Sequence, residues 1–404
     1  MKKTITVNKK KSLKLEKSIK PKKVYLPLIG YRTECKPMVK INDQVAIGTL
    51  IGKSKEPFEV NIRSTVSGKV IDILEKTYLN GSKIKCLVIE NDFKETKEII
   101  KVKEPTNQEE FVELLKVYGI QGMGGSGFPT YLKYQNKLKT LIVNAIECEP
   151  YLNTDNVLGI ESASEIIVGL EKMISILKLN RVIIGVKEKN KEFIKTFQEI
   201  LKDNPQIELK VLKDYYPLGY ERTLIKEVLN VTYKNLPSEK QIVVNNLATI
   251  HMISKALKNE YLTTRIITLS GDLTKTTNYK VKIGTLFSDL YKIEKPCHLI
   301  AGGPMMGECL LDDEVMITYN LNGLLLMKEI SISEEECLRC GKCVEVCPMK
   351  LSPVLIKDNF HNLDKLKALN PEKCIECGLC SFVCPAQIKI RERVKEAKEL
   401  VKEK

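Results

Sequence analysis

The sequence lacks tryptophan and has few histidines and arginines. It holds three histidines, and its 65 basic residues divide into 57 lysines and only eight arginines. Nucleic-acid surfaces usually combine arginine forks with interleaved aromatic side chains. Because arginine is scarce, we expect no nucleic-acid partner, although the net charge is +14.

The three histidines, His251, His298 and His361, make no cluster along the chain.

The sequence also lacks long hydrophobic runs. No stretch approaches the roughly 18 to 20 apolar residues of a membrane span, and the N-terminus has no apolar h-region. Its 43% apolar and 29% charged residues are ordinary for a soluble protein. We expect a cytoplasmic protein without a transmembrane segment. Its 404 residues exceed what one hydrophobic core organises, so two to four domains are expected.

The positive charge is concentrated at the N-terminus. Residues 1–23 hold ten lysines and one glutamate, which is +9 of the total of +14. We interpret this segment as a disordered, solvated basic tail. Docking to an anionic membrane or an acidic partner is the alternative, and it would make the protein peripheral on the cytoplasmic face of the membrane.

Thirteen cysteines in a cytosolic chain indicate metal or redox chemistry before disulfides. Eight of them form two strings that both read C-x2-C-x2-C-x3-C-P, the bacterial ferredoxin run for [4Fe–4S] clusters. The two-residue gaps place three thiolates at three corners of a cubane, and the fourth cysteine reaches the neighbouring cluster. We assign one cluster to Cys337, Cys340, Cys343 and Cys384, and the other to Cys374, Cys377, Cys380 and Cys347.

Structural zinc is the alternative for these cysteines, since zinc also binds four thiolates. Zinc sites normally use two well-separated C-x2-C pairs. A third cysteine in phase, repeated twice with a trailing Cys-Pro, does not fit that pattern. Two clusters in one small module predict an electron relay.

A glycine-rich segment, GIQGMGGSGFPTYLKY, occupies residues 119–134 and places five glycines in nine positions. A helical pattern precedes it at 107–117, and a buried strand is expected at 141–145, with further strands at 181–187 and 207–213. Alternating strands and helices predict a parallel α/β sheet. In such a sheet, loop amides beside a helix N-terminus bind an anion or a flat phosphorylated cofactor. The spacing is not that of an ordinary dinucleotide-binding turn.

The glycine-rich segment resembles the flavin and NADH loop of the NADH-binding subunit of respiratory complex I, and more closely that of the RnfC-like family. Further motifs follow in the order of that family: NAIECEPYLNTD (144–155), YYPLGYERTLI (215–225), VVNNLATI (243–250), GGPMMG (302–307) and the twin ferredoxin runs. The resemblance covers almost the whole chain and identifies it as a member of the RnfC-like group. It implies bound FMN, NADH as substrate and two [4Fe–4S] clusters.

The resemblance also implies roles for individual residues. The loop glycines would leave room for FMN and NADH, Phe128 would offer a stacking face, and Lys133 would place a positive charge beside the flavin. Asn144 would line the flavin with Glu147 and Glu149, the two catalytic candidates. The remaining cofactor-binding candidates are Gly122, Gly124, Gly125, Gly127, Asn245, Asn246 and Thr249. On the residues alone, the alternatives are a solvated lysine, an asparagine turn and an exposed acidic edge.

The sequence departs from the family near Glu221. Leu218 and Tyr220 stand where that branch more often has a small or amide residue and a glycine. A bulky Tyr220 would either cap the flavin or narrow the NADH pocket. A flavin-free electron relay or scaffold that keeps the fold and the clusters is therefore a further hypothesis.

The fold class implied by the motifs is multidomain α/β. A small β barrel-sandwich, like a lipoyl domain, is expected at 24–93, and a Rossmann-like FMN- and NADH-binding domain at 106–240. An SLBB β-grasp domain is expected at 241–330 and a helical ferredoxin-like domain at 331–404. A carrier lysine in the barrel would have to be Lys53 or Lys55, but a structural barrel is favoured.

The expected function is oxidation of NADH through FMN, with single electrons passing through the two clusters to a partner protein. The usual GGIHP opening of the family is absent here. The segment YRTECKPMVK also departs from RnfC and resembles PrdC, the soluble paralogue that accompanies proline reductase in amino-acid-fermenting anaerobes. Proline reductase is therefore the first partner hypothesis. Subunits of the ion-pumping Rnf membrane complex are the alternative. Within the same segment, Cys35 beside Lys36 is a candidate reactive thiol, because a neighbouring cation lowers a thiol pKa.

Overall fold

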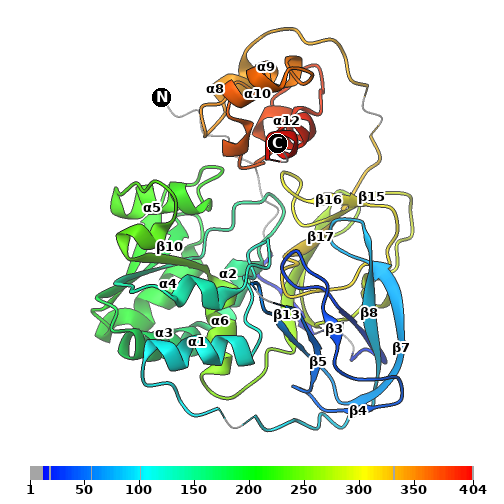
Figure 1. Cartoon of the computed structure of the whole chain (residues 1–404), viewed down its shortest axis with the longest axis vertical. Coiled ribbons are helices and arrows are strands. Elements are labelled where there is room, and N and C mark those ends of the chain that lie inside the picture. Colours follow the sequence, from blue (N-terminus) through cyan, green and yellow to red (C-terminus); the bar gives the residue numbers. More distant parts are fainter. Residues whose placement is uncertain (1–11, 18–19, 56, 101, 331–332, 403–404) are drawn as a thin grey trace.

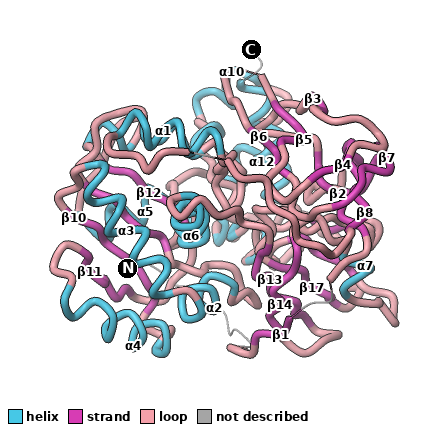
Figure 2. The backbone as a smooth tube through the Cα atoms, turned by 90° about the horizontal axis from the view of Figure 1, so that it is seen from below, coloured by secondary structure: helices cyan, strands magenta, loops and turns pink. Residues whose placement is uncertain are grey.

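The computed structural model describes residues 12–17, 20–55, 57–100, 102–330 and 333–402. An α/β domain and two β domains lie side by side, and a C-terminal helical domain lies above them in Figure 1. Seen from below in Figure 2, the helices of the α/β domain gather in one half and most strands in the other. None of the helices in the described ranges is long and apolar enough to cross a membrane.

The α/β domain contains a four-stranded sheet in the order β11-β10-β9-β12, with every neighbouring pair parallel. Its strands are β9 (Thr140–Asn144), β10 (Arg181–Lys187), β11 (Ile207–Leu212) and β12 (Ile242–Asn246). Successive side chains of a strand point to opposite faces, so Leu141 packs with α1, α3 and α6 while Ile142 packs with α5. The α-helices are α1 (Gln108–Val117), α2 (Thr154–Glu161), α3 (Ala163–Leu177), α4 (Lys191–Ile200), α5 (Glu221–Leu229) and α6 (Leu247–Ala256). The expected parallel sheet is confirmed.

The expected boundary between residues 240 and 241 is wrong. It would separate β12 from its own sheet, because β12 pairs with β9 along its whole length. The following helix, α6, packs against α3 of the same domain. The α/β domain therefore continues through α6 and ends before β13 begins at Thr264.

The barrel-sandwich consists of two small antiparallel sheets, ordered β2-β8-β7-β4 and β3-β5-β6. A long hairpin of β7 and β8 forms its largest part. Lys53, at the end of β5, forms an ion pair with Glu59 at 2.8 Å. The strands are β2 (Lys23–Pro27), β3 (Lys36–Pro37), β4 (Gln44–Val45), β5 (Leu50–Lys53), β6 (Asn61–Arg63), β7 (Gly68–Thr77) and β8 (Lys83–Asn91).

The interpretation of the N-terminal segment as a solvated tail is wrong for its described residues. β1 (Leu15–Lys17) adds a parallel edge strand beside β14 (Thr277–Lys282), and the Ser12 carbonyl accepts hydrogen bonds from Asn153 and Asn278. The physical reason is that β14 would otherwise present unpaired backbone groups at the edge of its sheet. Residues 1–11 and 18–19 of the expected tail lie outside the described part of the chain.

The second β domain is a six-stranded mixed sheet ordered β1-β14-β13-β17-β15-β16. Its two central strands, β13 and β17, are parallel, and an antiparallel partner follows on each side. A short helix, α7, lies between β14 and β15 in sequence. The elements are β13 (Thr264–Gly271), β14 (Thr277–Lys282), α7 (Phe287–Leu290), β15 (His298–Ala301), β16 (Glu308–Leu310) and β17 (Gly323–Met327).

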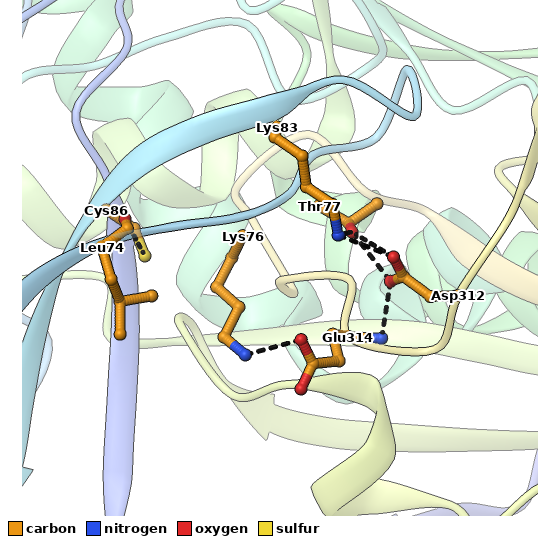
Figure 3. A network of polar contacts seen from close by, with 7 residues as sticks. All are labelled: Leu74, Lys76, Thr77, Lys83, Cys86, Asp312 and Glu314. Carbon is orange, nitrogen blue, oxygen red and sulfur yellow. Dashed lines mark hydrogen bonds and ion pairs between the residues drawn. The ribbon is translucent and has the colours of Figure 1, made fainter.

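Polar contacts join the barrel to the six-stranded sheet. Figure 3 shows side chains of the β7–β8 hairpin meeting the loop that follows β16. Lys83 Nζ lies 2.7 Å from Asp312 Oδ2, and Lys76 Nζ lies 2.7 Å from Glu314 Oε2. The Thr77 hydroxyl also donates to Asp312 at 2.7 Å. The two β domains therefore support each other through fixed side-chain pairs.

The C-terminal domain is helical and encloses a core of its own, with Ile356, Leu366 and Val394 fully buried. The last helix, α12, packs along α9 and closes the domain. Its helices are α8 (Lys342–Glu345), α9 (Pro353–Asp358), α10 (Leu363–Ala368), α11 (Leu379–Phe382) and α12 (Ile390–Lys402). The two shortest helices, α8 and α11, begin directly after Gly341 and Gly378, the glycines inside the two cysteine strings.

Candidate functional site

The first part of the site is the carboxyl edge of the parallel sheet. Asn144 ends β9 and Asn246 ends β12, and the two residues are direct partners in the strand register. β10 lies on one side of β9 and β12 on the other. In open α/β sheets, ligands bind in the crevice at such a reversal of strand order. The sequence-predicted pair Asn144 and Asn246 therefore lies where this fold places its ligands.

The glycine loop crosses this edge. The Met123 amide donates to the Thr249 hydroxyl at 2.9 Å, and a Cβ atom added at Gly124 would lie 3.0 Å from Asn246 Cβ. Gly124, Gly125 and Ser126 are exposed, and the amides of Gly124 and Ser126 donate to no other described residue. The loop thus presents bare backbone donors beside the N-terminus of α6, where the positive end of the helix dipole lies. These groups fit the phosphate of FMN.

Two buried carboxylates lie behind the loop. Glu147 is 5% exposed and accepts a hydrogen bond from the Asp155 amide, and Asp155, 3% exposed, accepts from Asn246 Nδ2 at 2.7 Å. Glu147 is therefore part of the site interior and not of an exposed acidic edge. Sequence reasoning did not single out Asp155, although it is the last residue of the NAIECEPYLNTD motif.

Lys133 and Asn144 are held by backbone carbonyls. Lys133 Nζ donates to the Val244 carbonyl at 2.8 Å and lies 3.4 Å from Glu221 Oε2. Asn144 Nδ2 donates to the Gly219 carbonyl at 2.9 Å. Lys133 is therefore an ordered cation at the sheet edge, in place of the solvated lysine that was the alternative.

Two other sequence-predicted residues have different contacts from those expected. Phe128 packs edge-on against Tyr31 of the barrel, with ring centroids 5.2 Å apart, so its ring is engaged in a contact between domains. Asn245 is buried and donates to the Tyr134 hydroxyl. Gly122 closes a turn, because its amide donates to the Phe128 carbonyl at 2.8 Å.

The structure shows where Leu218 and Tyr220, the two departures from the family pattern near Glu221, lie. Leu218 is fully buried in the apolar core between α5 and the sheet, and therefore does not narrow a pocket at the sheet edge. The loop containing it is fastened by Gly219, whose amide donates to Cys148 Sγ at 2.9 Å. Tyr220 precedes α5 and is half-buried.

Glu149 connects the sheet edge to the C-terminal domain. Its Oε2 accepts a hydrogen bond from the Met305 amide at 3.0 Å. Met305, in the GGPMMG loop, is buried with Tyr216, Cys377 and Leu379. The Tyr216 hydroxyl donates to the Cys377 carbonyl at 2.7 Å. A continuous path of contacts therefore runs from a predicted catalytic carboxylate to a predicted cluster ligand.

The eight string cysteines form two sets. Four of them line a single cavity: Cys337, Cys340, Cys343 and Cys384, named here the outer set. These are the four residues assigned to one cluster from their spacing. The other four, Cys347, Cys374, Cys377 and Cys380, are named the inner set.

Burial, with the nearby thiols of Cys374 and Cys347, raises the pKa of Cys377 to about 11 and that of Cys380 to about 12. The four inner sulfurs therefore lie within electrostatic range of one another. Among the described residues, no three metal-ligating side chains are grouped for a single metal ion. Around the outer cavity, four thiols contributed by both strings fit a [4Fe–4S] cluster.

The expectation of a reactive Cys35 is wrong. The residue is 5% exposed, and burial raises its pKa to about 12. Lys36 lies next to it in sequence, but Lys36 is exposed at the start of β3 while Cys35 is buried. Cys35 is a buried core thiol of the barrel.

Three family models match the chain in the order of its domains. The RnfC barrel sandwich hybrid domain matches residues 2–94, the Nuo51 FMN-binding domain residues 115–255, and the 4Fe-4S dicluster domain residues 336–388. The second match ends inside α6, in agreement with the revised domain boundary. Together the matches define an electron-transfer protein with a flavin domain and an iron–sulfur domain.

Relatives narrow the class to a family. One subunit of the proton-translocating ferredoxin:NAD(+) oxidoreductase complex of Clostridium ljungdahlii is 31% identical, over 83% of this chain and 78% of that protein. The corresponding subunit of the Na(+)-translocating complex of Acetobacterium woodii is 29% identical, over 84% and 81%. Its counterpart in the ion-translocating oxidoreductase complex of Vibrio cholerae is 35% identical over 82% of this chain, which spans 46% of that relative's length. The chain belongs to the RnfC family and is related to the FMN-binding subunit of complex I.

The relatives bear on the choice of partner. All three are subunits of ion-translocating complexes, which supports the Rnf alternative better than the proline reductase hypothesis that the sequence analysis favoured. The YRTECKPMVK segment, on which that preference rested, forms a strand and turn of the barrel, with its cysteine in the core.

Proposed function

We propose that the chain is the electron-input or electron-output subunit of an Rnf-type complex, in which NADH and FMN exchange a hydride and two [4Fe–4S] clusters carry single electrons to or from a partner protein. The observation that carries this proposal is the path of contacts from Glu149 through Met305 to Cys377. It joins the sheet edge to Cys377 of the inner set.

The residues of the sheet edge suit the cofactor. Bound FMN would supply the conversion between two-electron and one-electron chemistry. The free loop amides with Thr249 and Asn246 would hold its phosphate, and Lys133 would place a fixed positive charge at the same edge. Glu147 and Glu149 would orient the nicotinamide side of NADH through hydrogen bonds.

The two cysteine sets take different positions on the route. The inner set lies against the α/β domain through Tyr216 and against the six-stranded β domain through Met305. The outer set includes the exposed Cys340, and the neighbouring Leu338 is 65% exposed. We assign the inner set to exchange with the flavin and the outer set to exchange with the partner.

The six-stranded sheet is proposed to be the SLBB β-grasp domain. Its central parallel pair with an antiparallel partner on each side supports that assignment. The GGPMMG loop between β15 and β16 carries Met305, so this domain supplies part of the route between flavin and clusters. Peripheral attachment to a membrane complex follows from the relatives as part of the same proposal.

The test is an anaerobic absorbance titration of the iron-reconstituted protein with NADH, with released flavin quantified. About one flavin per chain, and bleaching of both the flavin band and the broad iron–sulfur absorption, is expected. Clusters without flavin, or a flavin that NADH cannot reduce, would support the flavin-free relay. Copurification with membrane subunits or with a reductase would then identify the partner.

A further inference from the structure

Arg265 belongs to β13, outside the α/β domain, but its guanidinium reaches the glycine loop. NH2 donates to the Met123 carbonyl at 3.0 Å and also to Asn322 Oδ1, while Nε donates to the Leu321 carbonyl. The residue is 3% exposed. NH1 is buried without a hydrogen-bond partner among the described residues. A buried cation in this position is costly unless its neighbours need the charge.

The charge of Arg265 is retained at neutral pH. Burial lowers its pKa to about 10, and the nearby carboxylates of Asp155 and Glu147 act in the opposite direction. These are the two buried carboxylates behind the glycine loop. Arg265 is therefore a fixed positive charge between the six-stranded sheet and the candidate flavin site.

The six-stranded domain also determines which way the loop peptides point. Arg265 binds the Met123 carbonyl, and Asn320 Nδ2 donates to the Gly125 carbonyl at 2.8 Å. In a trans peptide the carbonyl and the following amide point in opposite directions. The amides of Gly124 and Ser126 are consequently directed away from this domain, and neither donates to another described residue.

We propose that Arg265 is a positioning residue for the cofactor site: it holds the glycine loop with its amides turned outward and balances the charge of Glu147 and Asp155. The proposal rests on the proposed binding of FMN at this loop. It gives the β-grasp domain a direct part in flavin binding in addition to its place between flavin and clusters.

Arg63 is a matched control. It is also a largely buried arginine, and it also donates to two backbone carbonyls, Val117 at 2.7 Å and Gly48 at 2.8 Å. Burial lowers its pKa as well. Its hydrogen bonds hold the end of α1 and the barrel, and none goes to residues 122–127. Replacing it tests the loss of a buried arginine without the loss of the loop contact.

The experiment compares Arg265→Gln, Arg265→Lys and Arg63→Gln with the parent chain. FMN dissociation constants come from fluorescence, flavin midpoint potentials from redox titration, and loop opening from hydrogen exchange of residues 119–134 in flavin-free protein. Loss of a charge-assisted hydrogen bond should weaken FMN binding about tenfold or more in Arg265→Gln. The potential should become more negative, because the reduced flavin loses a nearby cation. Exchange of the hydrogen-bonded amides of this segment, such as those of Gly122 and Met123, should become faster.

Arg265→Lys keeps the charge but not the fork, so it should retain the parent potential while loop exchange still rises. Arg63→Gln should change neither FMN affinity nor loop exchange. If Arg265→Gln matches Arg63→Gln in all three measurements, the inference about Arg265 is wrong. If the parent chain binds no FMN but Arg265→Gln still opens the loop, the proposed flavin function fails while the loop contact stands.

Discussion

The two cysteine strings have the same spacing and opposite surroundings. Both place a glycine after the second cysteine, with left-handed φ angles of 72° at Gly341 and 77° at Gly378. Space around Gly341 is open, whereas a Cβ atom at Gly378 would lie 2.3 Å from the Met305 carbonyl oxygen. The motif specifies the cluster chemistry of each string. The domain that packs against the string specifies its place on the electron route.

The largest expected effect is the loss of stability when the glycine of each cysteine string is replaced by alanine. Gly341→Ala should cost roughly 1–2 kcal/mol, the strain of a left-handed alanine. Gly378→Ala adds a clash with the Met305 backbone, worth about 1–3 kcal/mol more, and should loosen the C-terminal domain from the six-stranded β domain. Thermal unfolding and limited proteolysis of residues 328–336 measure both. Equal losses in the two variants would contradict the docked position of the inner set.

The next effect concerns the hydroxyl of Tyr216. Tyr216→Phe leaves the buried Cys377 carbonyl without this donor and should destabilise the docked domain by about 1–3 kcal/mol. Tyr220→Phe, four residues along the same loop, removes a half-buried hydroxyl without that contact and serves as the control. Chemical denaturation gives both free energies of unfolding. A Tyr220→Phe loss as large as that of Tyr216→Phe would argue against a specific contact.

The smallest effect concerns Arg391 on α12. Its side chain is 12% exposed, and it pairs with Glu308 Oε1 at 3.2 Å and donates to the Met306 carbonyl at 3.3 Å. Arg391→Gln should cost about 0.5–1.5 kcal/mol, because one partner is a partly exposed carboxylate. The exposed Arg393, which forms only a local pair with Glu396, should cost less when changed to glutamine. Chemical denaturation gives the free energy of unfolding of both variants and shows which substitution costs more.

Local patterns predicted most elements and the cofactor chemistry. Alternation of polar and apolar residues identified β9 to β11, and cysteine spacing predicted two sets of ligands, one of which lines a single cavity. The partnership of Asn144 and Asn246 could not be read from either segment, because it depends on strand register. Asp155 lay in a recognised motif but gave no separate signal.

Contacts between distant segments account for what the sequence did not predict. Arg265 lies in a strand pattern and looks like any strand-end basic residue until the glycine loop packs against it. The edge strand β1 was hidden in a lysine-rich stretch, because its stability comes from β14 and not from its own side chains. The boundary after residue 240 was misplaced for the same reason, since β12 belongs to a sheet whose other strands precede it by 30 residues or more.

The most direct test of the account removes one cluster at a time. Cys377→Ala with Cys380→Ala removes two inner ligands, and Cys340→Ala with Cys343→Ala removes two outer ligands; electron paramagnetic resonance then follows reduction of the remaining cluster. With the outer ligands removed, NADH should reduce the inner cluster at the parent rate. With the inner ligands removed, NADH should leave the outer cluster oxidised while dithionite reduces it. Rapid reduction of the outer cluster by NADH in that variant would contradict the proposed route.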